Sequence, residues 1–553
     1  MKQMARFVSL LLVMLLLFGC ASDGSHTQTT TPDSSGVASD TAVLTEAALA
    51  EITKLGQSPD DNYRTFYEIF VYSFCDSNGD GIGDLRGVLS KLDYLQELGI
   101  TGIWFMPIHP SQSYHKYDVR DYYDIDPAYG TLADFEALMA ECQARDIHVI
   151  TDLVVNHTGD DHNWFLTAVD YLKSLPAGEE PSVDACPYVD YYFFSREAKP
   201  GYHAIEGSDW YYEGQFSPDM PDLNLASQAV REEIKAIMSF WIAKGVSGFR
   251  LDAAKEFYSG NLGANVEVLS WLQQTAVSIK EDCYLVAEVW ENFSTVTDYY
   301  ASGITSLFNF PFGNANGKIV EVLRAAGSAD KVASYATALE KANKAYAGSN
   351  PDYIDAPFLS NHDVGRIAGF VNRDENKMKL AGAMNIFMSG SCFIYYGEEI
   401  GMPGSGNDPS KRAPMYWNAA RNDGTTDPPP ECTLPEEYPL GSLEEQAGAD
   451  GSVYNYYRQA IAIRNAMPVI SHGDTTAETA LNVNCVSAQR KTWEDQTCII
   501  LMNINTEPAE VDLSGYGDWT LAVSLSADGT PIALEGTTLT LSAYGTAILV
   551  PAP

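Results

Sequence analysis

A short apolar segment that ends in four charged side chains constrains this sequence more than any other feature. The residues from Gly245 to Phe249 have the pattern of a buried strand, and Arg250, Asp252, Lys255 and Glu256 follow almost directly. Four charges have no packing use at the end of a buried strand, whereas a catalytic site at the carboxyl ends of barrel strands requires them. The segment therefore predicts a β/α architecture with a reactive centre at one end of its sheet.

Three further segments repeat this pattern of an apolar strand that ends in polar groups. They run from Val149 to His157, from Tyr284 to Trp290 and from Ala356 to Asp363. The four segments together supply carboxylates at Asp152, Asp252, Glu288 and Asp363, and imidazoles at His157 and His362. A structural ion pair would explain one Asp–Arg pair. Four such strand ends in one chain favour a shared site.

Apolar runs alternate with helical patterns along most of the chain, which is typical of a β/α barrel. We predict strands at Tyr67 to Phe74, Gly102 to Met106, His148 to Val155, Gly248 to Leu251, Tyr284 to Val289, Thr305 to Phe310, Ala356 to Leu359 and Cys392 to Tyr396. Amphipathic helices are expected at Leu89 to Leu98, Leu132 to Arg145 and Ala229 to Ala243. No helical pattern is evident between His157 and about Asp222, so we expect a long functional loop there. After about Met467 the pattern changes to short alternating strands.

The charge balance excludes one class of partner. The chain has 553 residues, with 74 acidic and 34 basic side chains and a formal net charge of −40. Binding to nucleic acid needs a basic face, so we expect no nucleic-acid partner. A soluble, well-hydrated surface and a neutral substrate both suit this charge.

The N-terminus indicates export. Lys2 and Arg6 precede an apolar run from Phe7 to Phe18, which is too short to span a bilayer as a mature helix. The run ends in a sequence that resembles a bacterial lipobox, which implies cleavage before Cys20 and lipidation of its thiol. An ordinary signal peptide with an incidental cysteine is the alternative. We therefore expect an exported protein, anchored by lipid at the outer face of a bacterial membrane. The other eight cysteines do not reveal their pairing.

The four polar strand ends resemble, in order and residue by residue, the signature regions of the alpha-amylase family of glycoside hydrolases. The resemblance extends from about Tyr63 to the C-terminus. It implies a (β/α)8 TIM barrel, with a small domain inserted after the third strand and a C-terminal antiparallel β-sandwich domain. The expected organisation is a lipoprotein signal peptide over 1–20, a tether over 21–60, a barrel over 61–157 and 223–467, an inserted domain over 158–222 and a β domain over 468–553.

The resemblance also assigns roles to individual residues. Hydrolysis of a glycosidic bond needs two carboxyl groups, and the resemblance makes Asp252 the nucleophile, Glu288 the acid/base and Asp363 the third carboxylate, which binds sugar hydroxyls. The residues implied in substrate binding are Tyr117, Asp118, His157, Arg250, Lys255, Glu256, His362 and Arg366. Typical amylases have His where this chain has Glu256.

A second group of residues suggests a cation. Oxygen-bearing side chains alternate with glycines from Asp76 to Asp84, a pattern that wraps a hard cation well. The stretch resembles the calcium loop after the first strand of several amylase-family groups, which implies Ca²⁺ bound by Asp76, Asn78, Asp80, Asp84 and the carbonyl of Ile82. The alternative is a tight turn without metal.

A few residues indicate which of the family's reactions this chain is expected to catalyse. Met220 to Asn224 resembles the MPDLN sequence of an intermediary group that contains many alpha-amylases, and Lys255 after the nucleophile also favours amylases. The resemblance thus implies retaining endo-hydrolysis of alpha-1,4-glucans, and we expect the protein to be a monomer. An exo-acting alpha-glucosidase or an oligo-1,6-glucosidase is the first alternative. A starch-binding surface lipoprotein without activity is the second, and the three intact carboxylates argue against it.

Overall fold

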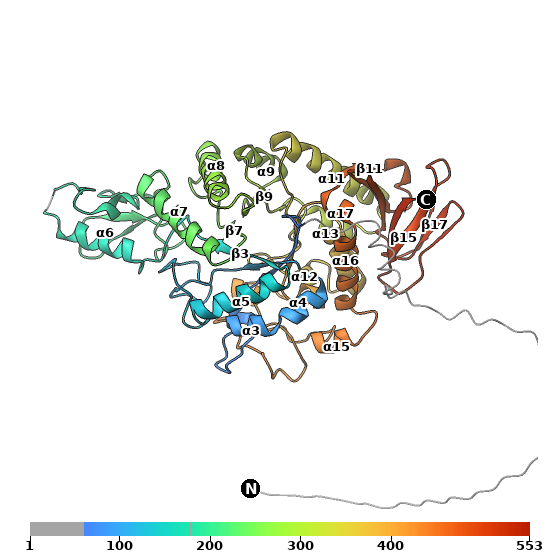
Figure 1. The fold of residues 1–553 in the computed structure, drawn as a ribbon, viewed down its shortest axis with the longest axis horizontal. Coiled ribbons are helices and arrows are strands. Elements are labelled where there is room, and N and C mark those ends of the chain that lie inside the picture. The colour runs from blue at the N-terminus through green and yellow to red at the C-terminus, as the bar shows by residue number, and fades with distance from the viewer. Residues whose placement is uncertain (1–59, 177, 553) are drawn as a thin grey trace, which may run out of the picture. The chain divides into compact units, whose positions relative to one another are not determined.

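The computed structural model describes residues 60–176 and 178–552, whose arrangement is shown in Figure 1. Cys20, the predicted signal peptide and nearly all of the predicted tether lie outside the described residues. Within the described chain no helix combines the length and the hydropathy needed to cross a membrane.

Seven parallel strands form the central sheet, in the order β10–β1–β2–β3–β7–β8–β9. Their bounds are β1 Thr65–Ile69, β2 Gly102–Phe105, β3 His148–Leu153, β7 Gly248–Leu251, β8 Tyr284–Ala287, β9 Ser306–Leu307 and β10 Cys392–Tyr395. Because every pairing is parallel, the carboxyl ends of all these strands lie at one end of the sheet. The expected TIM-barrel architecture is confirmed.

The predicted strand from Ala356 to Leu359 occupies the eighth position without forming a regular strand. A parallel bridge joins Phe308 to Ala356. The Asn309 amide donates to the Ala356 carbonyl at 3.0 Å, and the Phe393 amide donates to the Pro357 carbonyl at 2.8 Å. These bonds connect the segment to its neighbours on both sides, but Pro357 has no amide hydrogen for a regular ladder.

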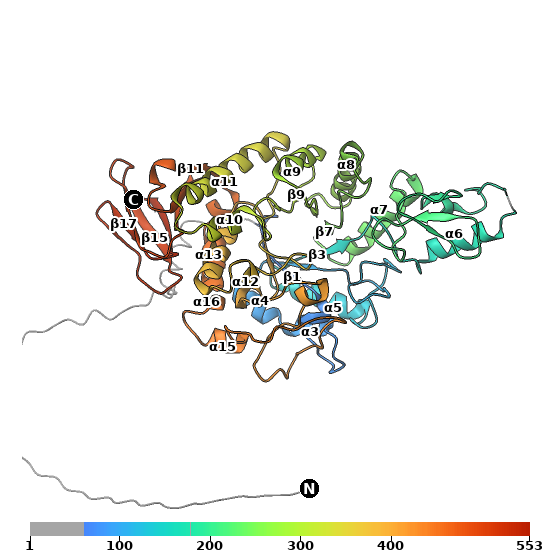
Figure 2. The ribbon, with the colours of Figure 1, turned by 180° about the vertical axis from the view of Figure 1, so that it is seen from behind.

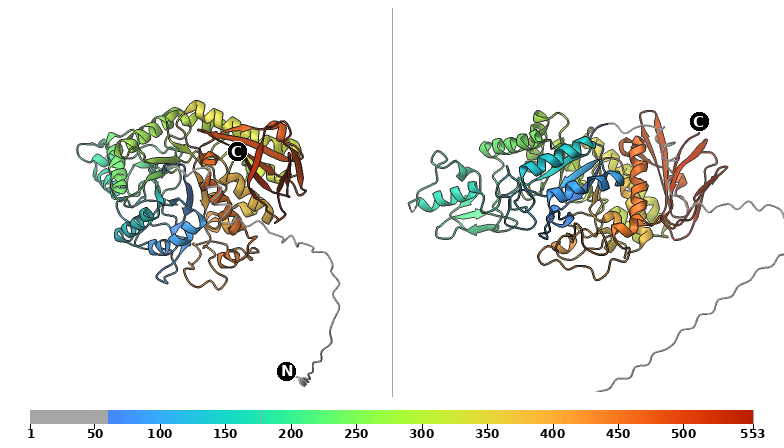
Figure 3. Two further views of the ribbon diagram at one scale, coloured as in Figure 1. Left: turned by 45° about the vertical axis from the view of Figure 1, so that its right-hand side comes forward. Right: turned by 60° about the horizontal axis from the view of Figure 1, so that its bottom comes forward.

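Helices follow the strands and lie outside the sheet, as Figure 3 shows. The longer ones are α5 Leu132–Ala144, α7 Gln228–Ala243, α8 Leu262–Ile279, α11 Ala329–Ser349, α13 Glu375–Ile386 and α16 Val453–Ala466. The shorter ones are α2 Val71–Phe74, α3 Leu85–Ser90, α4 Leu92–Leu98, α9 Phe293–Tyr299, α10 Lys318–Arg324, α12 Ile367–Phe370, α14 Asp408–Lys411, α15 Leu443–Ala447 and α17 Pro468–His472. The sequence predicts α5 and α7 to within one residue at each end.

Three predicted elements have wrong boundaries, and one of them, the strand expected from Thr305 to Phe310, is limited to β9. The strand expected from Tyr67 to Phe74 ends at Ile69, and a helical turn, α2, follows. Both pieces are buried, with Val71 and Phe74 in the core, so hydrophobicity does not mark the boundary between them. The helix expected from Leu89 to Leu98 is divided at Lys91 into α3 and α4.

The segment after His157, for which we expected a long loop from its pattern and an inserted small domain from the resemblance, contains regular secondary structure. It contains helix α6 (Asn163–Ser174) and a small antiparallel sheet of β4 (Phe194–Ser195), β5 (Tyr202–Ala204) and β6 (Tyr211–Glu213). The side chain of His162 caps α6, whose buried face includes Trp164 and Leu172. This apolar face at helical spacing is the signal that identifies the helix. The limits of the inserted domain remain predictions.

Two antiparallel sheets form the C-terminal part of the chain, which lies at the far end of the barrel from α6 in Figures 1 and 2. One sheet has the order β11–β12–β13–β18–β15, and the other β14–β17–β16. The strands are β11 Asp474–Ala477, β12 Val486–Trp493, β13 Gln496–Asn503, β14 Ala509–Asp512, β15 Trp519–Leu525, β16 Ala533–Glu535, β17 Thr538–Leu541 and β18 Thr546–Pro551. A shared core that includes Leu501, Leu539 and Leu549 packs the sheets face to face, as expected for a sandwich.

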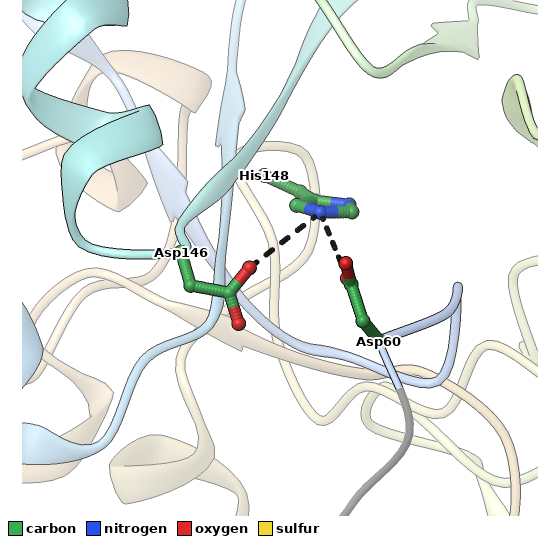
Figure 4. Close-up of side chains that lie close together, drawn as sticks. All are labelled: Asp60, Asp146 and His148. Carbon is green, nitrogen blue, oxygen red and sulfur yellow. Dashed lines mark ion pairs between the residues drawn. The ribbon is translucent and has the colours of Figure 1, made fainter.

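The described chain begins beside the amino-terminal ends of the barrel strands. Asp60, Asp146 and His148 lie together there (Figure 4), with His148 Nε2 3.5 Å from Asp60 Oδ1 and 4.0 Å from Asp146 Oδ1. Three such groups would suit a metal ion, but the guanidinium of Arg64 already lies among them. It pairs with Asp60, and lies 3.2 Å from Asp146 Oδ2 and 2.8 Å from His148 Nε2. We interpret the group as an arginine-centred ion cluster that fixes the start of β1 to the start of β3.

Candidate active site

Arg250, at the end of β7, lies at the centre of the predicted site and binds three carboxylates. Its Nη1 lies 2.6 Å from Asp152 Oδ1 and 2.6 Å from Asp252 Oδ1, and its Nη2 lies 2.9 Å from Glu288 Oε2. These groups come from the neighbouring strands β3, β7 and β8. Arg250 is fully buried, and Asp152, Asp252 and Glu288 are each less than a tenth exposed. Because unpaired buried charges are strongly destabilising, the guanidinium is what allows three carboxylates to share this space.

Glu288 has the environment of a proton donor. Burial raises the pKa of the Glu288 carboxyl, and the neighbouring Asp252 and Asp363 carboxylates raise it further, against the opposing effect of Arg250. The amide of Ala253 donates to Glu288 Oε2 at 3.1 Å. Ala253 takes a left-handed backbone conformation (φ 47°), which is unfavourable for alanine and typical of positions where a site holds the backbone.

Asp363 is held ionised by two cations. His362 Nε2 lies 2.9 Å from Asp363 Oδ2, and Arg412 Nη2 lies 2.8 Å from Asp363 Oδ1. Burial by itself would raise the pKa of Asp363, but His362 and Arg412 outweigh it and hold the pKa well below its usual value. Burial would lower the pKa of His362, but Asp363 and Glu68 raise it to about 9. His362 Nδ1 lies 2.6 Å from Glu68 Oε1 on β1, so a chain of charges joins Glu68, His362, Asp363 and Arg412, of which only Asp363 is partly exposed.

Tyr117 joins the two halves of this cluster. Its hydroxyl lies 2.7 Å from His362 Nε2 and accepts from Arg250 Nη1 at 3.3 Å, and its ring stacks on the His362 ring with centroids 5.5 Å apart. Asp118 faces its own loop instead, and accepts from the Ser111 hydroxyl at 2.6 Å. The predicted neighbours Tyr117 and Asp118 therefore occupy different environments.

His157 has an unused polar atom at the edge of the cluster. The side chain is buried, and its Nε2 has no hydrogen-bond partner within residues 60–176 and 178–552. Burial lowers the pKa of His157, which favours the neutral ring, and the negative charge of Asp252 opposes this effect. The ring of Phe216, which is half exposed on the inserted segment, lies 5.4 Å from the His157 ring. A ligand hydroxyl at this position would satisfy Nε2.

Three other predicted substrate-binding residues lie outside the cluster. Lys255 Nζ lies 3.3 Å from Glu291 Oε1 and 3.7 Å from Glu256 Oε1, at the partly exposed edge of the site. Arg366 is buried and donates to the carbonyls of Tyr396 at 2.6 Å and Lys411 at 3.1 Å. Arg412, which we did not predict, takes the position beside Asp363.

Glu68 and Trp104 are further site residues that the sequence interpretation missed. Trp104 Nε1 donates to Asp152 Oδ2 at 3.0 Å, and Glu68 binds His362. A single carboxylate within the apolar run of β1 is a signal that would have identified Glu68. Arg412 has no such signal, because it lies on an irregular segment and reaches Asp363 from 49 positions further along the chain.

The predicted calcium loop is curled by hydrogen bonds from its own backbone. Asp76 Oδ1 accepts from the Asn78 amide at 2.9 Å, Asn78 Oδ1 accepts from the Asp80 amide at 2.9 Å, and Asp80 Oδ1 accepts from the Ile82 amide at 2.8 Å. Burial of Asp76 is outweighed by amide donors within the loop, which lower the pKa of its carboxyl. The loop thus gathers ionised and neutral oxygens on one turn, and these oxygens fit a calcium ion.

Asp84 connects the loop to the helix that follows it. Its Oδ1 accepts from the Gly87 amide at 2.8 Å and so caps α3, and its Oδ2 accepts from the Ser77 amide at 2.9 Å. Both oxygens of Asp84 therefore accept from backbone amides, as do both oxygens of Asp76, whose Oδ2 accepts from the Gly81 amide at 2.8 Å. All five predicted groups, Asp76, Asn78, Asp80, Asp84 and the Ile82 carbonyl, therefore remain candidate ligands.

Comparison with known proteins gives a consistent result. The family described as the catalytic domain of alpha amylase matches residues 68–473. Alpha-amylase 3 of Dictyoglomus thermophilum is 39% identical over 449 residues, which cover 80% of this chain and 84% of that protein. A glucan 1,6-alpha-glucosidase of Streptococcus pneumoniae is 29% identical over 509 residues, which cover 81% and 92%. The solved structure of Eubacterium rectale Amy13B is 43% identical, with a TM-score of 0.88 and coverage of 91% of this chain and 98% of that one.

Proposed function

Since this chain belongs to the alpha-amylase family of glycoside hydrolases, we propose that it cleaves alpha-1,4-glucosidic bonds within starch, amylose and malto-oligosaccharides, with retention of configuration. The observation that carries this proposal is the binding of Asp252 and Glu288 to the two terminal nitrogens of one guanidinium, Arg250. Because Asp252 and Glu288 bind the same guanidinium, their carboxyl groups lie close together, as in retaining enzymes. Retaining enzymes use a separation of about 5 Å, whereas inverting enzymes leave room for a water molecule.

The two carboxyl groups have different tasks in the proposed mechanism. Glu288 donates its proton to the glycosidic oxygen as the bond from that oxygen to the anomeric carbon breaks, and an oxygen of Asp252 forms a bond to the same carbon. A water molecule then attacks the anomeric carbon of the ester, Glu288 accepts the proton of this water, and Asp252 leaves as a carboxylate. The raised pKa of Glu288 keeps its proton available near neutral pH.

The remaining groups bind the sugar that is cleaved. Asp363 is held ionised by His362 and Arg412, so it can accept hydrogen bonds from sugar hydroxyls and stabilise positive charge at the anomeric carbon. His157 offers its unused Nε2 to a hydroxyl of the same sugar. Phe216 and Trp290, which are both about half exposed, are rings on which neighbouring sugars can stack.

The alternative is an exo-acting alpha-glucosidase or an oligo-1,6-glucosidase. One support for it is the similarity to the glucan 1,6-alpha-glucosidase. The other is that Lys255 has two acidic partners, Glu256 and Glu291, which compete with sugars on the reducing side for its ammonium group. The time course of products on amylose, pullulan and isomaltose separates the two. A rapid loss of iodine staining with release of malto-oligosaccharides is expected, whereas glucose as the sole product, or cleavage of isomaltose, would establish the alternative.

A starch-binding protein without activity is tested by a single substitution. Asp252→Asn removes the proposed nucleophile with little change in size, so we expect it to abolish hydrolysis and to retain binding to amylose. Hydrolysis that survives this change would contradict the mechanism. Binding to starch with no hydrolysis by the unchanged protein would establish the binding function.

Two properties complete the proposal. Cys20 carries a lipid that holds the enzyme on the outer face of a bacterial membrane, where a polymer too large to import is accessible. Mass spectrometry of the mature N-terminal peptide tests this, with Cys20→Ala as the control. A calcium ion in the loop would be held by Asp76, Asn78, Asp80, Asp84 and the Ile82 carbonyl, and its positive charge would hold the loop closed.

A further inference from the structure

The segment 411–427 contacts the catalytic cluster at its first residues. Lys411 Nζ donates to the Asp363 carbonyl at 2.6 Å. Arg412 Nη2 binds the Asp363 carboxylate, and Arg412 Nε donates to the His362 carbonyl at 3.1 Å. Arg412 is buried, so these bonds fix its guanidinium against both residues. The position of Asp363 therefore depends on where this segment holds Arg412.

The next part of the segment runs along α2, directly before the candidate calcium loop. The Ser73 hydroxyl donates to the Arg412 carbonyl at 2.7 Å, and the Met415 amide donates to the Ser73 carbonyl at 2.8 Å. Trp417 Nε1 donates to the Phe74 carbonyl at 2.6 Å. Both Ser73 and Trp417 are buried. Three hydrogen bonds thus fasten the segment to α2.

The last part of the segment pairs with the candidate calcium loop itself. The Asp76 amide donates to the Gly424 carbonyl at 3.1 Å, and the Asp427 amide donates to the Gly81 carbonyl at 2.7 Å. A Cβ added at Gly81 would lie 2.5 Å from Asp427 Oδ2, so the Asp427 side chain packs directly against the backbone of Gly81. The same loop residues that would bind calcium therefore also hold the far end of the segment.

We propose that residues 411–427 form a strap that positions Asp363 through Arg412, and that calcium in the loop 76–84 tightens this strap. The inference rests on the proposed function, and it assigns Arg412, Ser73 and Trp417 as positioning residues. The loop oxygens carry negative charge, which repels within the loop when no cation is bound. A bound cation removes this repulsion and orders the backbone of Asp76 and Gly81, to which the strap is bonded. Order in the loop is then transmitted to Asp363 by contacts between neighbouring residues.

Hydrogen–deuterium exchange of the full chain, with and without calcium, tests the strap directly. We expect calcium to slow exchange in the loop 76–84, and also in peptides that cover 411–417 and 361–366, by about fivefold or more, the lower end of typical coupling between sites. Trp417→Phe keeps an aromatic ring but removes the indole donor, and Ser73→Ala removes the hydroxyl donor. In both variants calcium should still protect the loop while the effect at 361–366 disappears.

Trp519→Phe is the matched control, because it removes an indole donor to the Tyr516 carbonyl (2.9 Å) in the C-terminal sandwich. It should leave the spread of protection unchanged. In parallel, calcium should raise kcat on maltoheptaose more than it changes KM, and Trp417→Phe should remove this dependence. The strap proposal is overturned if calcium does not protect the loop, or if protection stays within 76–84. It is also overturned if protection reaches 361–366 in Trp417→Phe and Ser73→Ala to the same extent as in the unchanged protein. If protection spreads as expected but no glucan is cleaved, the proposed function fails and the strap remains.

Discussion

Arg250→Lys is the substitution that tests the organisation of the site most directly. Arg250 donates to Asp152, Asp252, Glu288 and the Tyr117 hydroxyl through its two terminal nitrogens. A lysine keeps the positive charge, but its ammonium is a single point and cannot reproduce the planar fork that holds Asp252 and Glu288 together. We expect about two charge-assisted hydrogen bonds to be lost, each worth about 1.5–3 kcal/mol. The total loss is about 3–6 kcal/mol.

Most of this loss should fall on the transition state, because the two carboxylates act there as nucleophile and proton donor. A loss of about 3–6 kcal/mol corresponds to a fall in kcat/KM of about 10²–10⁴-fold. The assay is the initial rate of cleavage of an aryl maltotrioside, normalised to the folded fraction measured by circular dichroism. Because lysine retains the positive charge, the buried carboxyl groups keep a cation beside them and the chain should still fold.

Arg464→Lys provides the matched control. Arg464 is also fully buried, and it donates to the carbonyls of Ile386 and Met388 at 2.8 Å each, far from the catalytic cluster in the chain. This variant should lose stability but keep the kcat/KM of its folded fraction. The reasoning is refuted if Arg250→Lys stays within about threefold of the unchanged enzyme, or if Arg464→Lys loses as much activity.

Three further predictions concern protons and the cation. Glu288→Gln should lower kcat on amylose by about 10²–10⁴-fold. The loss of kcat should be smaller on an aryl maltoside whose leaving group needs no proton. Equal losses on both substrates would argue against Glu288 as the acid. The pKa of His362 is raised to about 9 in the folded protein, above its unfolded value of about 6.5, so its stabilising contribution is complete below about pH 6.5 and is lost as the pH rises through 9. Glu68→Gln removes one of its two carboxylate partners and should move this loss to lower pH in thermal unfolding, whereas an unchanged pH profile would contradict the assignment. Calcium at one hundred times its Kd should stabilise the protein by about 2.7 kcal/mol, and Asp80→Ala should abolish the increase in Tm; an increase that persists in this variant would place the ion elsewhere.

The sequence predicted the barrel because its signals are local. The strand Gly248 to Leu251 ends where it was predicted, since charged residues follow at once, and α5 begins at Leu132 after a capping box formed by Thr131 and Asp134. The eighth barrel position was recognised from its apolar run, but Pro357 prevents a regular ladder. Where hydrophobicity continues through a change of structure, as from Ile69 into α2, the pattern gives no boundary.

The residues of the candidate site were likewise predicted only where the sequence carries a local signal for them. Asp252, Glu288 and Asp363 were found because each ends an apolar segment, and the structure brings them together around Arg250 and His362. Arg412 was not found, because its position depends on a long irregular segment whose path is fixed by tertiary hydrogen bonds to α2. The environment of Arg366 was mistaken for the same reason, since its partners are carbonyls distant in the sequence.

The position of the ion cluster around Arg64 has a practical consequence for presenting the enzyme on a surface. The cluster holds the first described residues at the amino-terminal ends of β1 and β3, whereas the catalytic carboxylates lie at the carboxyl ends of the strands. A bead, a membrane or a fusion partner attached ahead of Asp60 therefore joins the barrel on the side opposite its reactive centre. Immobilisation through this end leaves the cleft side free for insoluble starch granules, whereas coupling through lysines near the cleft, such as Lys255, would obstruct it.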